Sequence, residues 1–403
     1  MYSESNIKCH ICNSNNIFLF ETYPELGRVT SDCKPWPTGG KLGICSDCCI
    51  VQKVIDAHWR AEIQNIYSNY KLFHQSKDQK EQPVFNCSTG ESAPRSNVII
   101  NYANSKISIN EDFHIIDIGC GVGNTLKSLG KIFCDAKLYG FEPYVSDIQT
   151  LKDIKNVIEV YTDSNQFSNQ KFDLMTMFHV LEHIEAPKEV LQNLTSTISI
   201  SGHLVIAVPD YQANPFDLTI ADHASHFSID SLSALIESSG WDIVDITSDV
   251  INKEILAICK VSVSNNKSQN KAKNHQKLVE KQISWMHKTA SKAYQLSSQV
   301  QPFGIFGTSI AANWLYGVLN DKVNFFVDED PDRANRIFHN KPVYHTSNIP
   351  AGSHIFVCLQ PGVAEEITDR LNTDCYFLYT PPTYFNDKNA EIENFSSMQL
   401  ISE

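Results

Sequence analysis

Between about residue 95 and residue 262, seven short apolar runs alternate with amphipathic stretches. Strands that alternate with helices in this way form a mostly parallel sheet with helices on both faces. Only a short turn separates the last two runs, so we expect the last strand to enter antiparallel at the sheet edge. The pattern predicts an α/β fold on a seven-stranded sheet. Its runs are HIIDIG, AKLYGFE, VIEVYTD, FDLMTMFHV, HLVIAVPD, WDIVDITSD and EILAICKV.

The 403 residues are too many for one ordinary core and suggest several domains. Residues 1–85 are turn-rich and lack long periodic runs, so we expect a small domain that needs a cross-link, with a helical connection. Residues 86–263 hold the alternating core, and 264–300 read as a polar linker and a helix. In 301–403, FGIFG, VNFFVD and SHIFVCL predict a second, smaller Rossmann-like α/β domain.

Two helices carry clear local signals. Ser228 stands where an N-cap would precede IDSLSALIESS, and Gly240 stands where a C-cap would close that helix. Further along, apolar residues recur at steps of three and four, which is one face of a helix that packs on a core. They are Val279, Ile283, Met286, Ala290 and Ala293.

Charge excludes some partners. The formal net charge of −13 leaves no basic footprint for nucleic acid and would be repelled by an anionic membrane. The N-terminus lacks a basic region followed by an apolar one, and no run of 18 apolar residues occurs. We therefore expect a cytoplasmic protein that acts on a small molecule.

Two Cys-x-x-Cys pairs lie near the N-terminus, Cys9 with Cys12 and Cys45 with Cys48. Four thiolates on two knuckles suit a closed tetrahedral Zn²⁺ site, which implies a structural metal. The 32 residues between the pairs exceed the commonest ribbon spacing, and free or redox-active thiols are the alternative.

The first strand ends in Asp117 and opens a turn with Gly119, Gly121 and Gly123. Such a turn lets the backbone approach a ligand at the switch point of the sheet. A dinucleotide fingerprint needs its third glycine at the position of Asn124, and an acid before the turn would repel a pyrophosphate. An NAD-binding sheet is therefore the weaker alternative.

An acid at this strand end is matched to a ligand with positive charge. S-adenosylmethionine carries a sulfonium and an amino-acid head, which Asp117 can face. Glu142, at the end of the second run, is placed to accept hydrogen bonds from both ribose hydroxyls. Asp163, at the end of the third run, is placed to meet the adenine amino group. These residues predict S-adenosylmethionine as the cofactor.

Together with FDLMTMFHVLEHIEAP, this series resembles the class I S-adenosylmethionine-dependent methyltransferases, in which an HVLEH-like segment closes the fourth strand. The whole chain is similar to the three-domain sugar methyltransferases, of which the nucleotide-sugar C-methyltransferases are the best-known members. CHIC, CSDCCIVQ, DIGCGVGNTL, DHASHFS and FFVDEDPDRANR carry the likeness. The resemblance implies a zinc-binding N-terminal domain and a C-terminal domain that help to hold a sugar nucleotide.

That family uses a histidine base in an acid-His segment, which Asp222-His223 matches. The resemblance therefore implies that His223 is the general base and that Asp222 orients it; the alternative is that His223 packs ahead of the following helix. Tyr70, with Tyr67, lies near the place of the family's active-site tyrosine, with interdomain packing as the alternative. Ile220 stands where the C-methyltransferases place a tyrosine, which puts carbon as the acceptor atom in doubt.

Two further segments have open roles. His179 is a candidate contact for cofactor or substrate, whereas His183 is interpreted as structural. The turn GIFGTSIAANW holds only Gly304 and Gly307, so a cofactor-free fold is favoured there over a nucleotide site.

The sequence thus predicts methyl transfer to a sugar or nucleotide sugar. The first alternative is an O- or N-methyltransferase that acts on a polysaccharide precursor or another small metabolite. The second is a non-catalytic binding protein that keeps the cofactor fold, although such a scaffold would not need Asp117, Gly119, Gly121 and Glu142. The sequence leaves the acceptor atom and the oligomeric state open.

Overall fold

The computed structural model describes residues 7–70, 81, 83–85, 92–107, 113–144, 147–263, 275–360, 362–371 and 373–383. Most of the predicted polar linker and the predicted polar tail from about 385 lie outside the described residues. Within the described ranges, no helix has both the length and the apolar character that a membrane crossing needs.

The central sheet has seven strands in the order β10-β9-β8-β11-β12-β15-β14, as predicted from the seven apolar runs. β8 to β12 run parallel, and β15 is antiparallel to both of its neighbours. The strands are β8 (His114–Ile118), β9 (Lys137–Phe141), β10 (Val157–Tyr161), β11 (Phe172–Phe178), β12 (Ile198–Pro209), β14 (Trp241–Thr247) and β15 (Glu254–Val261).

The expectation that the last strand lies at the sheet edge is wrong. β15 lies between β12 and β14, and β14 forms the edge. The burial of the two strands explains this order, because the first six residues of β15 are buried whereas most of β14 is partly exposed. The more apolar strand therefore takes the position with a neighbour on each side.

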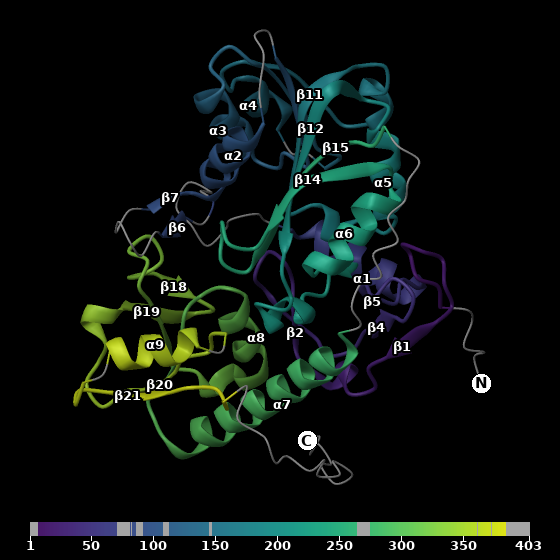
Figure 1. Ribbon diagram of the computed structural model, residues 1–403. Helices are drawn as coiled ribbons and strands as arrows, with labels where there is room; N and C mark the ends of the chain where they lie inside the picture. The colour runs from purple at the N-terminus through teal and green to yellow at the C-terminus, as the bar shows by residue number, and fades with distance from the viewer. Residues whose placement is uncertain are drawn as a thin grey trace.

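Helices cover both faces of this sheet (Figure 1). Ser228 caps α6 by accepting a hydrogen bond from Ser231 N, and Gly240 follows that helix with φ +90°, as the capping signals predicted. One core cluster draws on α2 to α4 and the other on α5 and α6. The helices are α2 (Arg95–Lys106), α3 (Asn124–Ile132), α4 (Ile148–Lys152), α5 (Pro187–Leu194) and α6 (Ile229–Ser238).

The N-terminal part forms a sheet in the order β1-β4-β5-β13. Its last strand comes from the core range, because Ser225 and His226 pair with Gln52 and Val51. The two parts of the chain therefore share one sheet. The elements are β1 (Ile17–Leu19), β2 (Arg28–Val29), β3 (Pro35–Trp36), β4 (Leu42–Cys45), β5 (Val51–Lys53), α1 (Ala57–Ser68), β6 (Pro83–Phe85), β7 (Ser92–Pro94) and β13 (Ser225–His226).

The C-terminal part forms a six-stranded sheet in the order β18-β19-β17-β16-β20-β21. The three strands expected here are β16, β17 and β20, and they lie next to one another. The elements are α7 (Gln276–Gln299), β16 (Phe303–Phe306), α8 (Ile310–Leu319), β17 (Phe325–Asp328), β18 (Ile337–Phe338), β19 (Lys341–His345), β20 (His354–Phe356), α9 (Val363–Arg370) and β21 (Phe377–Tyr379).

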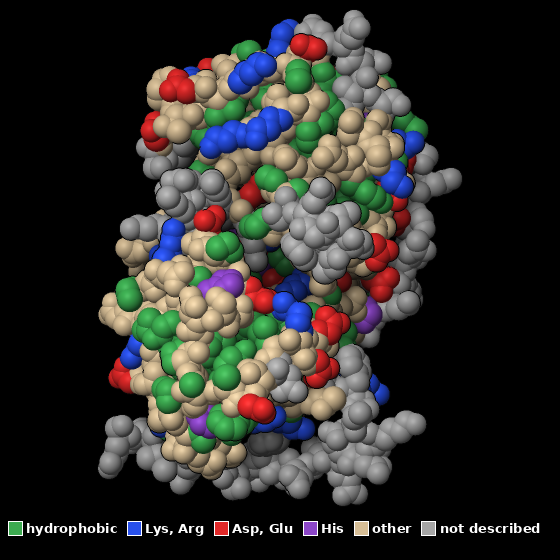
Figure 2. Space-filling view, turned by 90° about the vertical axis from the view of Figure 1, so that its left-hand side faces the viewer, with side chains coloured by type: hydrophobic (Ala, Val, Ile, Leu, Met, Phe, Trp, Pro, Cys, Tyr) green, Lys and Arg blue, Asp and Glu red, His purple; other side chains and the backbone are tan. Residues whose placement is uncertain are grey.

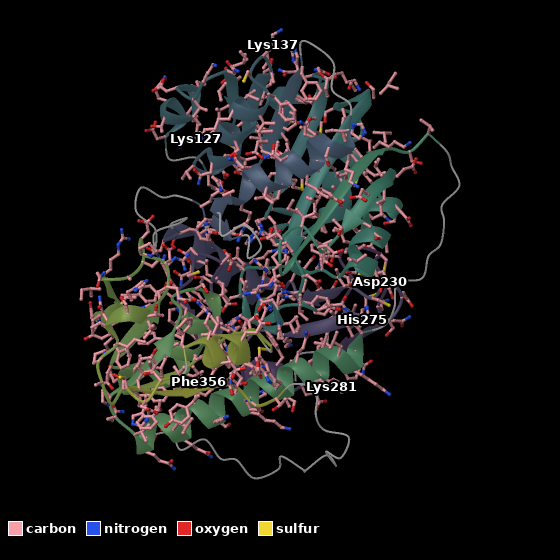
Figure 3. All side chains as sticks on the ribbon, turned by 60° about the vertical axis from the view of Figure 1, so that its left-hand side comes forward. Lys127, Lys137, Asp230, His275, Lys281 and Phe356 are labelled. Carbon is pink, nitrogen blue, oxygen red and sulfur yellow. The ribbon has the colours of Figure 1, made fainter. Side chains whose placement is uncertain are left out.

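The apolar stripe of α7 packs on a core, as predicted, with four of its five residues buried. At its start, His275 lies beside Asp230 of α6, with 3.3 Å between Nε2 and Oδ2 (Figure 3). The core that α7 covers also contains Tyr23 of the N-terminal part, Phe216 of the central part, and Trp314 of α8. The three parts are thus packed against one another around this shared core.

Candidate functional site

A cavity of about 2540 Å³ opens at the carboxyl ends of the central strands. Figure 2 shows a hollow midway along one face of the molecule, with acidic and basic side chains around it. The N-terminal part, the central sheet and the C-terminal part all contribute lining residues. A cavity at this end of a parallel sheet is where the glycine turn was predicted to hold its ligand.

The glycine turn forms one wall of the cavity. Gly119 and Gly121 line it and both have positive φ, whereas Gly123 does not line it. A Cβ on Gly119 would lie 2.3 Å from Val180 Cγ2, and one on Gly123 would lie 2.5 Å from Ile154 Cδ1. Gly123 therefore serves helix packing, which corrects its predicted role as a cofactor contact.

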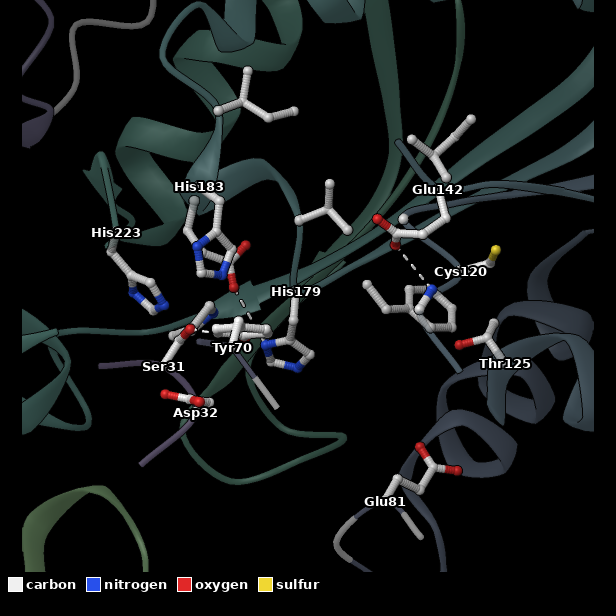
Figure 4. Close-up of a pocket in the computed structure, with 18 of the residues that line it drawn as sticks. Ser31, Asp32, Tyr70, Glu81, Cys120, Thr125, Glu142, His179, His183 and His223 are labelled. Carbon is white, nitrogen blue, oxygen red and sulfur yellow. Dashed lines mark hydrogen bonds and ion pairs between the residues drawn. The ribbon is translucent and has the colours of Figure 1, made fainter. Parts of the chain in front are cut away.

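Glu142 also lines the cavity, as predicted, immediately after β9. Its Oε2 accepts a hydrogen bond from Gly121 N at 3.0 Å, and its Oε1 accepts one from Tyr144 N at 3.3 Å. Figure 4 shows this carboxylate beside the turn, across the cavity from three histidines. The remaining acceptor capacity of the carboxylate is available to a ligand's hydroxyl groups.

Asp117 is buried behind the turn and does not line the cavity, which corrects the expectation that it faces the cofactor. Its Oδ1 accepts a hydrogen bond from the hydroxyl of Thr176 in β11 at 2.6 Å, and its Oδ2 has no hydrogen-bond partner within the described residues. Burial raises the pKa of Asp117 to about 7, and the nearby charge of Glu142 adds to this rise.

Asp163 is exposed and does not line the cavity, so its predicted contact with an adenine amino group is not seen. Instead its carboxylate caps the short 3-10 helix of residues Ser164–Phe167 by accepting from Asn165 N. Three residues of this helix, Ser164, Asn165 and Phe167, line the cavity in its place. The strand ends at Tyr161, two residues before Asp163, and the capping role of Asp163 turns its carboxylate outward.

His179 lines the cavity, with φ +56°, and lies in a charged network. Its Nε2 is 3.1 Å from both Arg95 Nη1 and Glu254 Oε2, and its Nδ1 is 3.4 Å from Glu182 Oε1. Burial lowers the pKa of His179, but the charge of Glu254 outweighs this and the pKa rises to about 9. The imidazolium form is therefore favoured beside the cavity at neutral pH.

His223 lines the cavity, but its partner is not the predicted Asp222. Its Nδ1 lies 3.0 Å from Oδ1 of Asp217, whose Oδ2 accepts a hydrogen bond from His226 Nδ1 at 2.7 Å. Burial favours the neutral form of His223, yet Asp217 outweighs this and raises the pKa of His223 above its usual range. Sequence reasoning missed Asp217, which has no local signal because it lies six residues before the histidine.

Asp222 instead joins the N-terminal part to the core. It accepts hydrogen bonds from the backbone N and the hydroxyl of Ser31, and its main-chain oxygen lies 3.0 Å from His183 Nδ1. The hydroxyl of Ser31 is 2.9 Å from that of Tyr70, which lines the cavity. The hydroxyl of Tyr67 lies 3.1 Å from His183 Nδ1. His183 therefore also belongs to the cavity, beyond the structural role expected of it.

The four predicted metal ligands converge. Cys9 Sγ lies 3.4 Å from Cys48 Sγ, Cys12 Sγ lies 3.6 Å from Cys45 Sγ, and all four atoms lie within 4.8 Å of one another. Sulfur atoms at the corners of a zinc tetrahedron are about 3.8 Å apart, given Zn–S bonds of about 2.3 Å. The donor set thus fits a closed Zn²⁺ site, despite the long spacing between the pairs.

The far wall of the cavity comes from the C-terminal part, at the turn where a cofactor-free fold was favoured over a nucleotide site. Ser309 and Ile310 stand at the N-terminus of α8, and Arg333 follows β17. Gln360, which lies after β20, is buried and its Oε1 has no hydrogen-bond partner within the described residues. The helix start in GTSIAA was the available signal, and the structure places it on the cavity wall.

Comparisons with known proteins agree with this geometry. The family described as "Methyltransferase domain" matches residues 97–246. The mitochondrial ubiquinone biosynthesis O-methyltransferase of Schizosaccharomyces pombe is 25% identical over 153 residues, which cover 33% of this chain and 56% of that protein. Its counterpart in Dictyostelium discoideum is 28% identical over 127 residues, which cover 26% of this chain and 39% of that protein.

These matches span 56% and 39% of the lengths of the two relatives. The plantazolicin methyltransferase BpumL, solved with SAH, is similar over 41% of this chain and 82% of its own, with 13% identity and a TM-score of 0.35. A likeness this low supports no functional conclusion. Residues 97–246 thus match a methyltransferase domain family, and the parallel sheet and the glycine turn bonded to Glu142 agree with that match.

Proposed function

We propose that this chain transfers the methyl group of S-adenosylmethionine to a sugar or nucleotide-sugar acceptor. The observation that carries the proposal is one cavity that extends from Glu142, past His223, to Arg333 of the C-terminal part. Its volume of about 2540 Å³ exceeds the roughly 300–1,000 Å³ of ordinary small-molecule sites. The cavity therefore has room for a large acceptor beside the cofactor.

The acceptor end offers groups for a phosphorylated sugar. The N-terminus of α8 presents backbone N–H groups that attract anions, and Arg333 adds a guanidinium that suits phosphate oxygens. His223 stands between this end and the glycine turn, with its Nδ1 beside Asp217 and its Nε2 left to remove a proton. Methyl transfer needs the acceptor and the methyl group in line, so positioning and proton removal are the tasks of the protein.

The four cysteines complete the proposal. Cys9, Cys12, Cys45 and Cys48 would bind a structural Zn²⁺, because four converging thiolates leave no open position for a substrate. Metal analysis of the purified protein should find zinc, and alkylation of all four thiols in the native protein would contradict it.

O-methylation of another small metabolite is the second candidate. The names of the two curated relatives favour it, and so does a group of aromatic rings at the cavity. Tyr67 stacks near Tyr144, with 6.4 Å between ring centroids, and lies edge-on to Tyr70 at 5.4 Å. Such rings can hold an aromatic acceptor as well as a sugar.

Calorimetric titration with S-adenosylhomocysteine tests the cofactor site. Glu142→Gln should lower the affinity about 10- to 100-fold, the usual effect of a lost charged hydrogen bond, whereas Glu366→Gln on the exposed face of α9 should not. No heat with the folded wild type would defeat the methyltransferase proposal.

Transfer of a labelled methyl group to nucleotide sugars and, in parallel, to catechols separates the two acceptor classes. We expect labelled nucleotide sugar, and loss of labelling in His223→Ala while S-adenosylhomocysteine still binds. Labelling of catechols alone would favour the second candidate.

A further inference from the structure

Glu182, His183 and His223 bring three metal-ligating groups together in the cavity, between the glycine turn and the C-terminal wall. Each offers one ligand atom, and the three atoms lie within 4.8 Å of one another. All three residues line the cavity, and Figure 4 shows His183 and His223 adjacent at its left-hand end. Glu182 and His183 belong to the 3-10 helix η4 (Leu181–His183), whereas His223 precedes β13.

Both imidazoles are oriented through their Nδ1 atoms. His223 Nδ1 lies 3.0 Å from the carboxylate of Asp217, and His183 Nδ1 lies 3.0 Å from the main-chain oxygen of Asp222. Metal-binding histidines commonly donate one ring N–H to a carboxylate or a backbone oxygen and ligate through the other nitrogen. The Nε2 atoms of both residues are the nitrogens left for a ligand.

Glu182 supplies the second, independent observation. Its side chain is 1% exposed, and neither carboxylate oxygen has a hydrogen-bond partner within the described residues. The nearest cationic group is the imidazolium of His179, whose Nδ1 forms an ion pair with Oε1 at 3.4 Å and makes no hydrogen bond to it. His179 compensates part of the charge of this buried carboxylate, but both oxygens still lack a bonded partner. A cation between Glu182 and the two imidazoles would supply one.

We propose that Glu182, His183 and His223 form a site for a divalent transition-metal ion such as Zn²⁺ or Co²⁺. Two imidazoles and one carboxylate suit these ions, whereas Mg²⁺ and Ca²⁺ prefer oxygen ligands. The site differs from the four-cysteine cluster because it has no thiolate and opens on the cavity. Three protein ligands with an open position are the pattern of zinc sites that exchange a fourth ligand.

The site has a consequence that rests on the proposed function. A metal bound to His223 Nε2 occupies the atom that would remove the acceptor's proton, so metal binding and proton removal exclude each other. We expect the ion to inhibit methyl transfer without changing the affinity for S-adenosylhomocysteine, because Glu142 and the glycine turn contribute no ligand to it.

Titration of the full chain with Co²⁺ tests the site. The four-cysteine cluster should bind the first equivalent with an intense sulfur-to-cobalt charge-transfer band. The second equivalent should add visible d–d absorption without further charge transfer. Glu182→Gln and His183→Gln should each lose the second equivalent and keep the first, whereas the matched control His203→Gln, outside the cavity lining, should bind both.

One equivalent in the wild type, or a second equivalent that survives in both variants, would overturn the proposal. If Glu182→Gln does not fold, as judged by S-adenosylhomocysteine binding, His183→Gln decides alone. Failure of the proposed function looks different, because the protein would then bind both Co²⁺ equivalents but no S-adenosylhomocysteine. Metal that accelerates methyl transfer would contradict the base role of His223 and leave the metal site standing.

Discussion

At the scale of single residues, Asp117 shows how burial changes the meaning of a motif. Its position after the first strand suggested a charged contact for the cofactor, yet the side chain is 2% exposed and hydrogen-bonded to Thr176. The pKa of Asp117 rises from the ordinary 3.8 to about 7 because burial penalises the carboxylate. A raised carboxyl pKa adds stability at low pH, and this stability is lost as pH increases towards 7.

We therefore predict that Asp117→Asn raises the free energy of unfolding above that of the wild type by more at pH 8 than at pH 5. Between these values the carboxylate ionises in the folded state, which corresponds to about 3 kcal/mol at about 1.4 kcal/mol per pH unit. The neutral amide avoids this cost. Urea unfolding at both pH values measures the free energy of unfolding, and Asp135→Asn, at an exposed position, is the control. Equal pH dependence in wild type and Asp117→Asn would mean that Asp117 is ionised throughout.

Asp217 is the second residue whose role only its contacts reveal. It is buried between His223 and His226, and these histidines hold the pKa of Asp217 well below its usual range. One carboxylate thus orients two imidazoles, one of which lines the cavity. The contact at 3.0 Å holds the ring of His223 through its Nδ1 side.

Replacing this carboxylate should separate positioning from cofactor binding. Asp217→Asn should lower kcat on the order of 10²-fold, because the amide can favour the wrong tautomer of His223. Affinity for S-adenosylhomocysteine should stay unchanged, because Asp217 lies away from Glu142 and the glycine turn. Nitrogen-15 NMR of the imidazoles reports the tautomer directly, and an unaltered Nδ1–H signal together with wild-type kcat would remove Asp217 from the mechanism.

At the scale of elements, the N-terminal part holds the segment 218–226 along most of its length. β13 adds to the N-terminal sheet, and Ser225 Oγ lies 2.7 Å from His10 Nε2, next to Cys9. Several N-terminal groups bond to the segment's backbone. The Tyr23 hydroxyl and Lys53 Nζ donate to Leu218 O, and Trp59 Nε1 donates to Ala221 O. In the backbone, Lys53 N donates to Ala224 O, and Ala221 N donates to Val29 O.

The cysteine cluster should therefore control the order of the segment that carries His223. In Cys45→Ser we expect faster hydrogen exchange across residues 218–226 and at least tenfold lower turnover, with S-adenosylhomocysteine affinity unchanged. Cys134→Ser is the matched control, because Cys134 is exposed and outside the cluster. Unchanged exchange in a Cys45→Ser protein that has lost its zinc would show that the segment does not depend on the cluster.

At the scale of the whole molecule, the cavity exists because three parts of the chain meet around it. A core of side chains from the N-terminal part, residues 211–220 and the C-terminal part holds these parts together. Trp314 of α8 donates a hydrogen bond to Gly27 O at 2.9 Å, which ties the first and last parts directly. The C-terminal wall therefore lies across the cavity from Glu142 and the glycine turn.

Arg333→Ala should raise the KM for a nucleotide-sugar acceptor about 10- to 100-fold, the usual loss of a charged hydrogen bond to phosphate. The KM for S-adenosylmethionine should not change, since Arg333 lines the opposite wall. Steady-state kinetics with both substrates varied give the two values. The exposed Arg370→Ala serves as control, and a KM unaffected by Arg333→Ala would separate the C-terminal part from acceptor binding.

Features that depend on neighbours along the chain were predictable from sequence. The seven strands follow from alternating apolar runs, the ends of α6 follow from Ser228 and Gly240, and Glu142 follows from its place after β9. The four cysteines also converge, as their two Cys-x-x-Cys pairs predicted. In each case the interactions that set the feature are local or repeat at a fixed period.

Contacts between distant segments required the folded chain. Three contacts join residues that no sequence pattern links. They are Asp217 beside His223, β13 paired with β5, and η4 next to His223. Local patterning sets which segments become strands and helices and which strand ends can hold a ligand. Packing decides which side chains share a space, because burial, charge compensation and hydrogen bonding are settled between elements that meet only after the chain has folded.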